Sequence, residues 1–251
     1  MRLTTITLSA DSIADAIRSL ALFYGVPQSE IEDVYERRWP DFLSPETPFE
    51  DFKNEWLTWS LGQEIKSQAM NRDIPVSFYH RARFDGCSNW FDDGLLNNHQ
   101  GAQAFFKKIK THPKWRPTLD QARDIALSNI RDRDGLSRAH GPHAFDLLDL
   151  ARRANRAGLD YDLPECLMGP VWDNYPELKS ELVSFCQENL KPVVVKFVAT
   201  PESMDCYINH LWLYLHIERF GFDLCDTKIY SFNGRSQNVP RAAIVDLIEI
   251  R

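Results

Sequence analysis

Apolar side chains recur every three or four residues through the first part of the chain, a spacing typical of amphipathic helices. The positions from Ile13 to Leu20 follow this spacing, and Gly25 marks its end because glycine is common just beyond the last helical turn. Similar patterns predict helices over about 28–38 and 49–70. The sequence therefore predicts a helical N-terminal region over residues 1–72.

The pattern then changes to short runs of β-branched and aromatic residues, which are typical of strands. Such runs lie at Ile74–His80, Val193–Val198, Lys228–Phe232 and Ala243–Ile250. Helical patterns fall between the strands, over about 88–110, 118–133, 144–157, 176–189 and 203–219. An α+β domain over residues 73–251 is therefore expected to follow the helical region.

Composition places the chain among packed globular proteins. It has 251 residues, of which 43% are hydrophobic and 12% aromatic, enough for one large domain or for a core domain with a smaller appendage. The net charge is −7, whereas proteins that neutralise many phosphates usually carry a basic excess. The charge gives no support for a nucleic-acid partner, although it does not exclude one.

The cysteines and the N-terminal residues indicate the cellular compartment. The five cysteines include no Cys-x-x-Cys pair, so neither a zinc ribbon nor a disulfide framework is indicated, and free thiols fit a reducing compartment. Residues 1–10 lack the apolar run of a signal peptide, and no apolar run has the length of a membrane span. We expect a cytoplasmic protein with no membrane partner.

The segment from Tyr79 to Leu96 holds the most informative group of residues. A strand is expected to end at Tyr79-His80, followed by a turn at Asp85-Gly86 and a short helix with Trp90. Gly94-Leu95 lies where that helix would end. Because ligands commonly bind where strands run into loops, we expect His80 to face a cleft.

This segment resembles the first motif of the ADP-ribosyltransferase fold, which includes poly-ADP-ribose polymerases, DNA-targeting ADP-ribosyltransferase toxins and RNA 2′-phosphotransferases. In that family a strand ends in an aromatic residue and a histidine, and a Gly-Leu pair follows a short helix. Residues 238–248 are similar to the closing segment of the same family. The resemblance covers 74–100 and about 190–251, and it implies a split antiparallel sheet.

The resemblance also implies a chemistry, in which NAD is the substrate and its ADP-ribose passes to an acceptor. His80 would hydrogen-bond a ribose of NAD, because an imidazole can both donate and accept. The residues that would bind NAD beside it are Tyr79, Arg81, Arg83 and Gly94, with Tyr207, Tyr214 or Tyr230 stacking on the nicotinamide ring. The arginines suit the pyrophosphate because guanidinium groups bind such oxygens in pairs.

The family's catalytic acid has no match at its usual place, since no Asp or Glu lies between Asp226 and Asp246. Glu218, Asp226 and Glu202 are the candidates for this role, with Glu218 preferred. The acceptor stays open between a protein and a nucleic acid. By analogy with such folds, a bacterial toxin or phage-defence effector is a further hypothesis, with an antitoxin or regulatory protein as partner.

Two other functions remain open: an NAD-binding domain without transferase activity, and a non-enzymatic interaction protein in which the tryptophans serve packing or a partner surface. Metal sites are not expected. His210 and His216 are six residues apart on one predicted helix, whereas a helical metal pair needs a spacing of four. His143, near Asp146, is interpreted as a turn histidine, and Cys87 near His80 as an incidental thiol.

Overall fold

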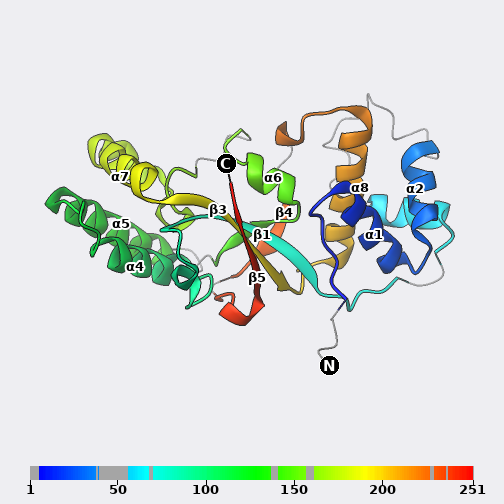
Figure 1. Ribbon diagram of the computed structural model, residues 1–251, viewed down its shortest axis with the longest axis horizontal. Coiled ribbons are helices and arrows are strands. Elements are labelled where there is room, and N and C mark those ends of the chain that lie inside the picture. Colours follow the sequence, from blue (N-terminus) through cyan, green and yellow to red (C-terminus); the bar gives the residue numbers. More distant parts are fainter. Residues whose placement is uncertain are drawn as a thin grey trace. The chain divides into compact units, whose positions relative to one another are not determined.

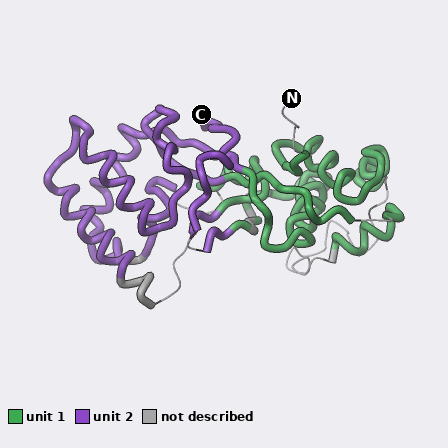
Figure 2. Tube along the Cα trace, turned by 90° about the horizontal axis from the view of Figure 1, so that it is seen from below, with its two compact units in different colours: residues 1–79, 144–157, 198–232 green, residues 80–143, 158–197, 233–251 purple. Residues whose placement is uncertain are grey.

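The computed structural model describes residues 6–37, 39, 56–67, 70–136, 141–156, 161–226, 229–235 and 237–250. The chain forms two compact units, coloured separately in Figure 2. Unit 1 comprises residues 1–79, 144–157 and 198–232, and unit 2 comprises 80–143, 158–197 and 233–251. The division therefore differs from the expected boundary after residue 72, because later segments pack with the N-terminal helices.

Five strands form one sheet in the order β4-β2-β1-β3-β5 (Figure 1). Their bounds are β1 (Val76–Phe84), β2 (His143–Phe145), β3 (Lys191–Ala199), β4 (Tyr230–Asn233) and β5 (Ile244–Glu249). Antiparallel pairing joins β1 to β2 at Tyr79 and Phe145, and β3 to β5 with Val194 opposite Ile248. The α+β class is confirmed. The split sheet of the ADP-ribosyltransferase type is not found, since the described strands belong to one sheet.

Unit 1 is built around one long apolar helix. Its helices are α1 (Ile13–Tyr24), α2 (Gln28–Arg37), α3 (Trp56–Glu64), α6 (Leu148–Arg153) and α8 (Met204–Phe220), with the 3₁₀ turn η5 (Leu224–Asp226). Helix α8 buries eleven residues and contacts α1, α2 and α3 (Figure 1). A helix that is covered on several sides must be apolar around most of its surface, which explains its continuous aromatic and aliphatic sequence.

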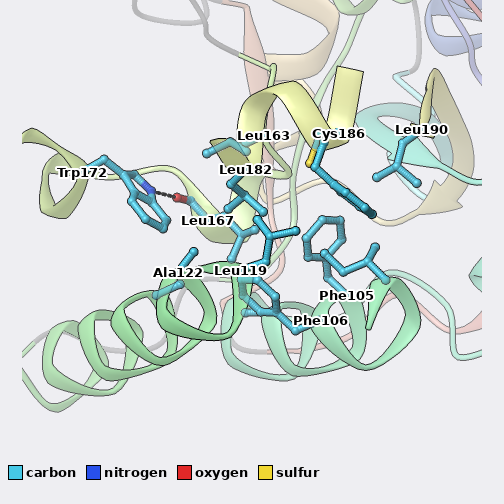
Figure 3. Packing of buried hydrophobic residues seen from close by; sticks show 14 of the residues in the cluster. Phe105, Phe106, Leu119, Ala122, Leu163, Leu167, Trp172, Leu182, Cys186 and Leu190 are labelled. Atoms are coloured by element: carbon cyan, nitrogen blue, oxygen red, sulfur yellow. Dashed lines mark hydrogen bonds between the residues drawn. The ribbon is translucent and has the colours of Figure 1, made fainter. Parts of the chain in front are cut away.

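Unit 2 contains a second, separate core. Its helices are α4 (Asn98–Ile109), α5 (Pro117–Leu136) and α7 (Pro176–Asn189), with the 3₁₀ turns η2 (Ser88–Phe91), η3 (Glu165–Leu167), η4 (Pro170–Asn174) and η6 (Arg241–Ala243). Phe105, Phe106 and Leu182 pack between α4, α5 and α7 (Figure 3). Trp172 is also buried there, and its Nε1–H donates to the Leu167 carbonyl at 2.6 Å.

Two expected helices are shorter than the apolar patterns suggested. The helix expected over 88–110 is interrupted, because Asn97 accepts a hydrogen bond from the Gln100 amide and so begins α4 afresh. The helix expected over 144–157 starts only at Leu148, since Ala144 and Phe145 belong to β2. The expected start of the 49–70 helix lies outside the described residues. None of the helices in the described part is long and apolar enough to cross a bilayer.

Candidate functional site

A pocket in unit 2 brings together four residues that the sequence pointed to: His80, Arg81, Arg83 and Gly94. Its volume is about 100 Å³, well above the roughly 10–15 Å³ that one water needs. Other side chains that line it are Trp90, Phe91, Asn98, Phe105, Lys108, Glu165 and Cys166.

Strand β1 positions the first of these residues. The sequence predicted that the strand would end at His80, but β1 continues to Phe84, so His80 lies within the strand. Residues 80–83 all contribute to the pocket wall. The prediction that His80 borders a cleft is therefore confirmed, although its position at a strand end was wrong.

Hydrogen bonds determine the orientation of the His80 ring. Its Nδ1 atom lies 2.7 Å from the His143 carbonyl oxygen, which can only accept, so Nδ1 carries a proton. In the neutral ring Nε2 is then an acceptor. Nδ1 also lies 3.5 Å from the Glu165 Oε2 atom. The ring is thus held at Nδ1, and in its neutral form Nε2 can accept a hydrogen bond.

Glu165 links two histidines at the pocket. Its Oε1 atom accepts from Nδ1 of His143 at 2.5 Å, and Oε2 accepts from the His143 backbone N–H at 3.2 Å. The hydrogen bond to this carboxylate raises the pKa of His143, against the effect of burial. No local pattern pointed to Glu165, because it follows Pro164 in a stretch with no clear periodicity and lies far from His80 along the chain.

Arg81 is a buried cation in the pocket wall. The residue is 6% exposed, and its Nε and Nη1 atoms have no hydrogen-bond partner among the described residues. Burial, together with repulsion from Arg83, lowers the pKa of Arg81 to about 10. The guanidinium is therefore still charged at neutral pH. A buried charge with unpartnered nitrogens is stabilised when an anion binds to it.

The other two cations at the pocket have protein partners. Arg83 donates to the carbonyls of Tyr161 and Leu190 and to Asp162, with distances of 3.1–3.3 Å. Lys108 donates to the Trp90 carbonyl, and its Nζ lies 5.1 Å from the centroid of the Trp90 ring. Burial lowers the pKa of Lys108. Arg81 thus differs from its neighbours in lacking an acceptor at two nitrogens.

Gly94 has a structural reason to be glycine. Its φ angle is +81°, and a Cβ there would lie 2.0 Å from the Val239 carbonyl oxygen. Leu95 and Val239 exchange backbone hydrogen bonds of 2.9 and 2.8 Å. The Gly-Leu pair therefore joins the C-terminal segment to the pocket's edge, and the two stretches that resembled one family do meet.

The remaining predicted site residues lie in unit 1 and are not part of this pocket. Tyr79 is fully buried, and its hydroxyl donates to Asp11 at 2.7 Å. Tyr207 is also fully buried, and Tyr214 donates to Asp149 at 2.8 Å. As a correction, these tyrosines have the packing of core residues. They are not placed to stack on a ligand in the pocket.

Glu218, the preferred catalytic acid, lies on α8 in unit 1, where its charge helps to raise the pKa of Tyr214 after burial and the Asp149 contacts. Tyr230 begins β4, and its side chain lies outside the described residues. Within the pocket the carboxylate comes from Glu165 instead. The aromatic side chains there are Trp90, Phe91 and Phe105.

The described residues include no group of three His, Cys, Asp or Glu side chains suited to a metal ion. His216, which the sequence assigned to helix packing, lies among the rings of Trp39, Phe220 and Phe222. Comparison with known proteins adds no relative, since no family model, no curated protein and no solved structure matches the chain.

Proposed function

We propose that unit 2 binds NAD in the pocket beside β1 and transfers its ADP-ribose to an acceptor. The observation that carries the proposal is the buried guanidinium of Arg81, which has two unpartnered nitrogens and lies next to His80. Guanidinium groups bind the oxygens of phosphate and pyrophosphate, and these two buried donors have no acceptor among the described residues. An anionic ligand of the nucleotide class is therefore the best match for this wall of the pocket.

The other residues of the pocket support roles in the same chemistry. Nε2 of His80 is oriented to accept a hydrogen bond from a ribose hydroxyl, because the His143 carbonyl holds the proton on Nδ1. The Glu165 carboxylate lies 3.5 Å from the same ring. A carboxylate at this place stabilises the positive charge that develops on ribose when nicotinamide leaves. Glu165 thus replaces Glu218 as the proposed acid.

Free nicotinamide after incubation with NAD measures turnover, and the melting temperature measures binding. We expect nicotinamide release by the wild type, and a loss of roughly 10²-fold or more in His80→Ala and Glu165→Gln. Arg81→Met should remove the thermal shift caused by ADP-ribose. Arg116→Met is the matched control, because the Arg116 side chain is 76% exposed and lies outside the pocket.

A second candidate is an NAD-binding regulator that does not transfer ADP-ribose. It is favoured by the contacts of Glu165, whose two carboxylate oxygens both meet His143. A thermal shift that depends on Arg81 without nicotinamide release would support this candidate. If millimolar NAD causes no thermal shift and no nicotinamide is released, both candidates are overturned. The interaction protein is then the better hypothesis.

A further inference from the structure

A second group of reactive side chains lies in unit 1, around the first turns of α8. Ser203 caps this helix by accepting from the Cys206 amide at 3.1 Å, which places Cys206 in its first turn. His210 follows four residues later, on the same face of the helix. The Cys206 Sγ atom lies 3.7 Å from Nε2 of His210. A thiol and an imidazole are thus within hydrogen-bond reach.

A buried carboxylate holds the other side of the imidazole. Asp146 directly follows β2 and is 0% exposed, and its Oδ2 atom lies 2.5 Å from Nδ1 of His210. Because the carboxylate accepts the Nδ1 proton, Nε2 is the nitrogen that faces the thiol. A nucleophile, a base and a group that orients the base are therefore present in the order that a catalytic triad requires.

The imidazole of this group has a strongly raised pKa. Burial by itself would lower the pKa of His210, but the hydrogen bonds to Asp146 and Cys206 raise it to about 10. The imidazole accordingly holds a proton well at neutral pH. Cys206 is partly buried.

We propose that Cys206, His210 and Asp146 form a thiol active site that acts on carbonyl compounds such as esters and thioesters. In the reactive form the pair carries one proton, which lies on Nε2 of His210, and the Sγ thiolate attacks the carbonyl carbon. The bond to the leaving group breaks, and that group takes the proton from Nε2, which leaves an acyl thioester on Cys206 and a neutral His210. Water then gives a proton to Nε2 and attacks the thioester, and the acid is released as Sγ leaves as the thiolate, which restores the starting pair.

This site is independent of the pocket in unit 2, so either proposal can fail alone. The spacing of four residues between Cys206 and His210 is visible in the sequence, but no pattern links them to Asp146, which follows the turn histidine His143 by three residues. The structure instead pairs it with His210, 64 residues away along the chain.

The test uses 4-nitrophenyl acetate as the acyl donor, with nitrophenolate release followed by absorbance and the modified cysteine identified by mass spectrometry of peptides. We expect acetylation at Cys206, with loss of release in Cys206→Ser and a drop of roughly 10²-fold in His210→Gln. Asp146→Asn should act like His210→Gln, because an amide facing Nδ1 disturbs the tautomer. Cys225→Ser, which changes another partly buried thiol of unit 1, is the control and should keep the wild-type rate.

A second measurement, cysteine labelling of the wild-type protein, does not depend on the folding of any variant. Limited iodoacetamide should label Cys206 faster than the exposed Cys87. Labelling of Cys87 first, or an acetyl group found elsewhere with Cys206 unmodified, would overturn the proposal. An unchanged rate of nitrophenolate release in folded His210→Gln would do the same.

Discussion

The indole Nε1 of Trp212 donates a hydrogen bond of 3.0 Å to the hydroxyl of Tyr24, although 188 residues separate them in the chain. The same hydroxyl donates to the Thr58 carbonyl at 2.7 Å. One buried oxygen thus joins α1, α3 and α8, and it connects the N-terminal helices of unit 1 to the late helix that covers them.

Tyr24→Phe should destabilise unit 1. The change keeps the ring but removes the hydroxyl, which leaves the Trp212 N–H and the Thr58 carbonyl buried without this partner. We expect a loss of about 1–3 kcal/mol in the free energy of unfolding. Urea denaturation measures it, with Tyr175→Phe as control because Tyr175 is 41% exposed. Equal losses in the two variants would show that the shared hydroxyl contributes nothing.

Gly94→Ala and Gly221→Ala form a matched pair, because both glycines have positive φ angles, +81° and +73°. A Cβ at Gly221 meets nothing within 4 Å, so only the backbone preference of about 1–2 kcal/mol is lost there. At Gly94 the Cβ would strike the Val239 carbonyl. We expect Gly94→Ala to cost clearly more in urea denaturation, and comparable values would contradict the close approach of these two segments.

Arg81→Met should raise stability in dilute buffer without anions. The substitution removes a buried charge with two unpartnered nitrogens, so we expect a gain of about 1–3 kcal/mol in the free energy of unfolding. Sulfate should stabilise the wild type more than Arg81→Met at equal ionic strength. If the variant is instead strongly destabilised and sulfate affects both proteins alike, Arg81 has a structural role.

His210 should make the stability of unit 1 depend on pH. Its pKa is about 10 in the folded chain and roughly 6.5 when unfolded, so the stabilisation is complete below about pH 6.5 and is lost as the pH rises towards 10. Relative to His210→Gln, the wild type should lose up to about 1.4 kcal/mol for each pH unit in this window. Denaturation at pH 6 to 9 measures the difference, and parallel curves for the two proteins would exclude the raised pKa.

Several elements could be predicted from local pattern alone. Helix α7 spans the residues expected, 176–189, and α8 lies within one residue of its predicted bounds. The Gly25 C-cap and the strand around Val193–Val198 are also confirmed. These features depend on side-chain spacing, capping and turn preferences, which act over a few residues and are visible in any single stretch of chain.

Pairings between distant segments could not be predicted in this way. Glu165 reaches His143 and the vicinity of His80, and Asp146 meets His210, but no periodicity connects such positions. The tyrosines expected at the pocket illustrate the opposite error, since Tyr79 and Tyr207 are core residues of unit 1. An aromatic side chain has the same sequence signature whether it packs in a core or lines a site.

The sequence by itself determined the α+β class, most of the helices and strands, and the grouping of His80, Arg81, Arg83 and Gly94 at one pocket, because these four lie close together along the chain. Only the tertiary structure decided which carboxylate faces each histidine, that Arg81 is buried with two unpartnered nitrogens, and how the chain divides into two units. Those outcomes depend on the packing of segments far apart in sequence, where burial and hydrogen bonding are set by neighbours that a local pattern does not contain.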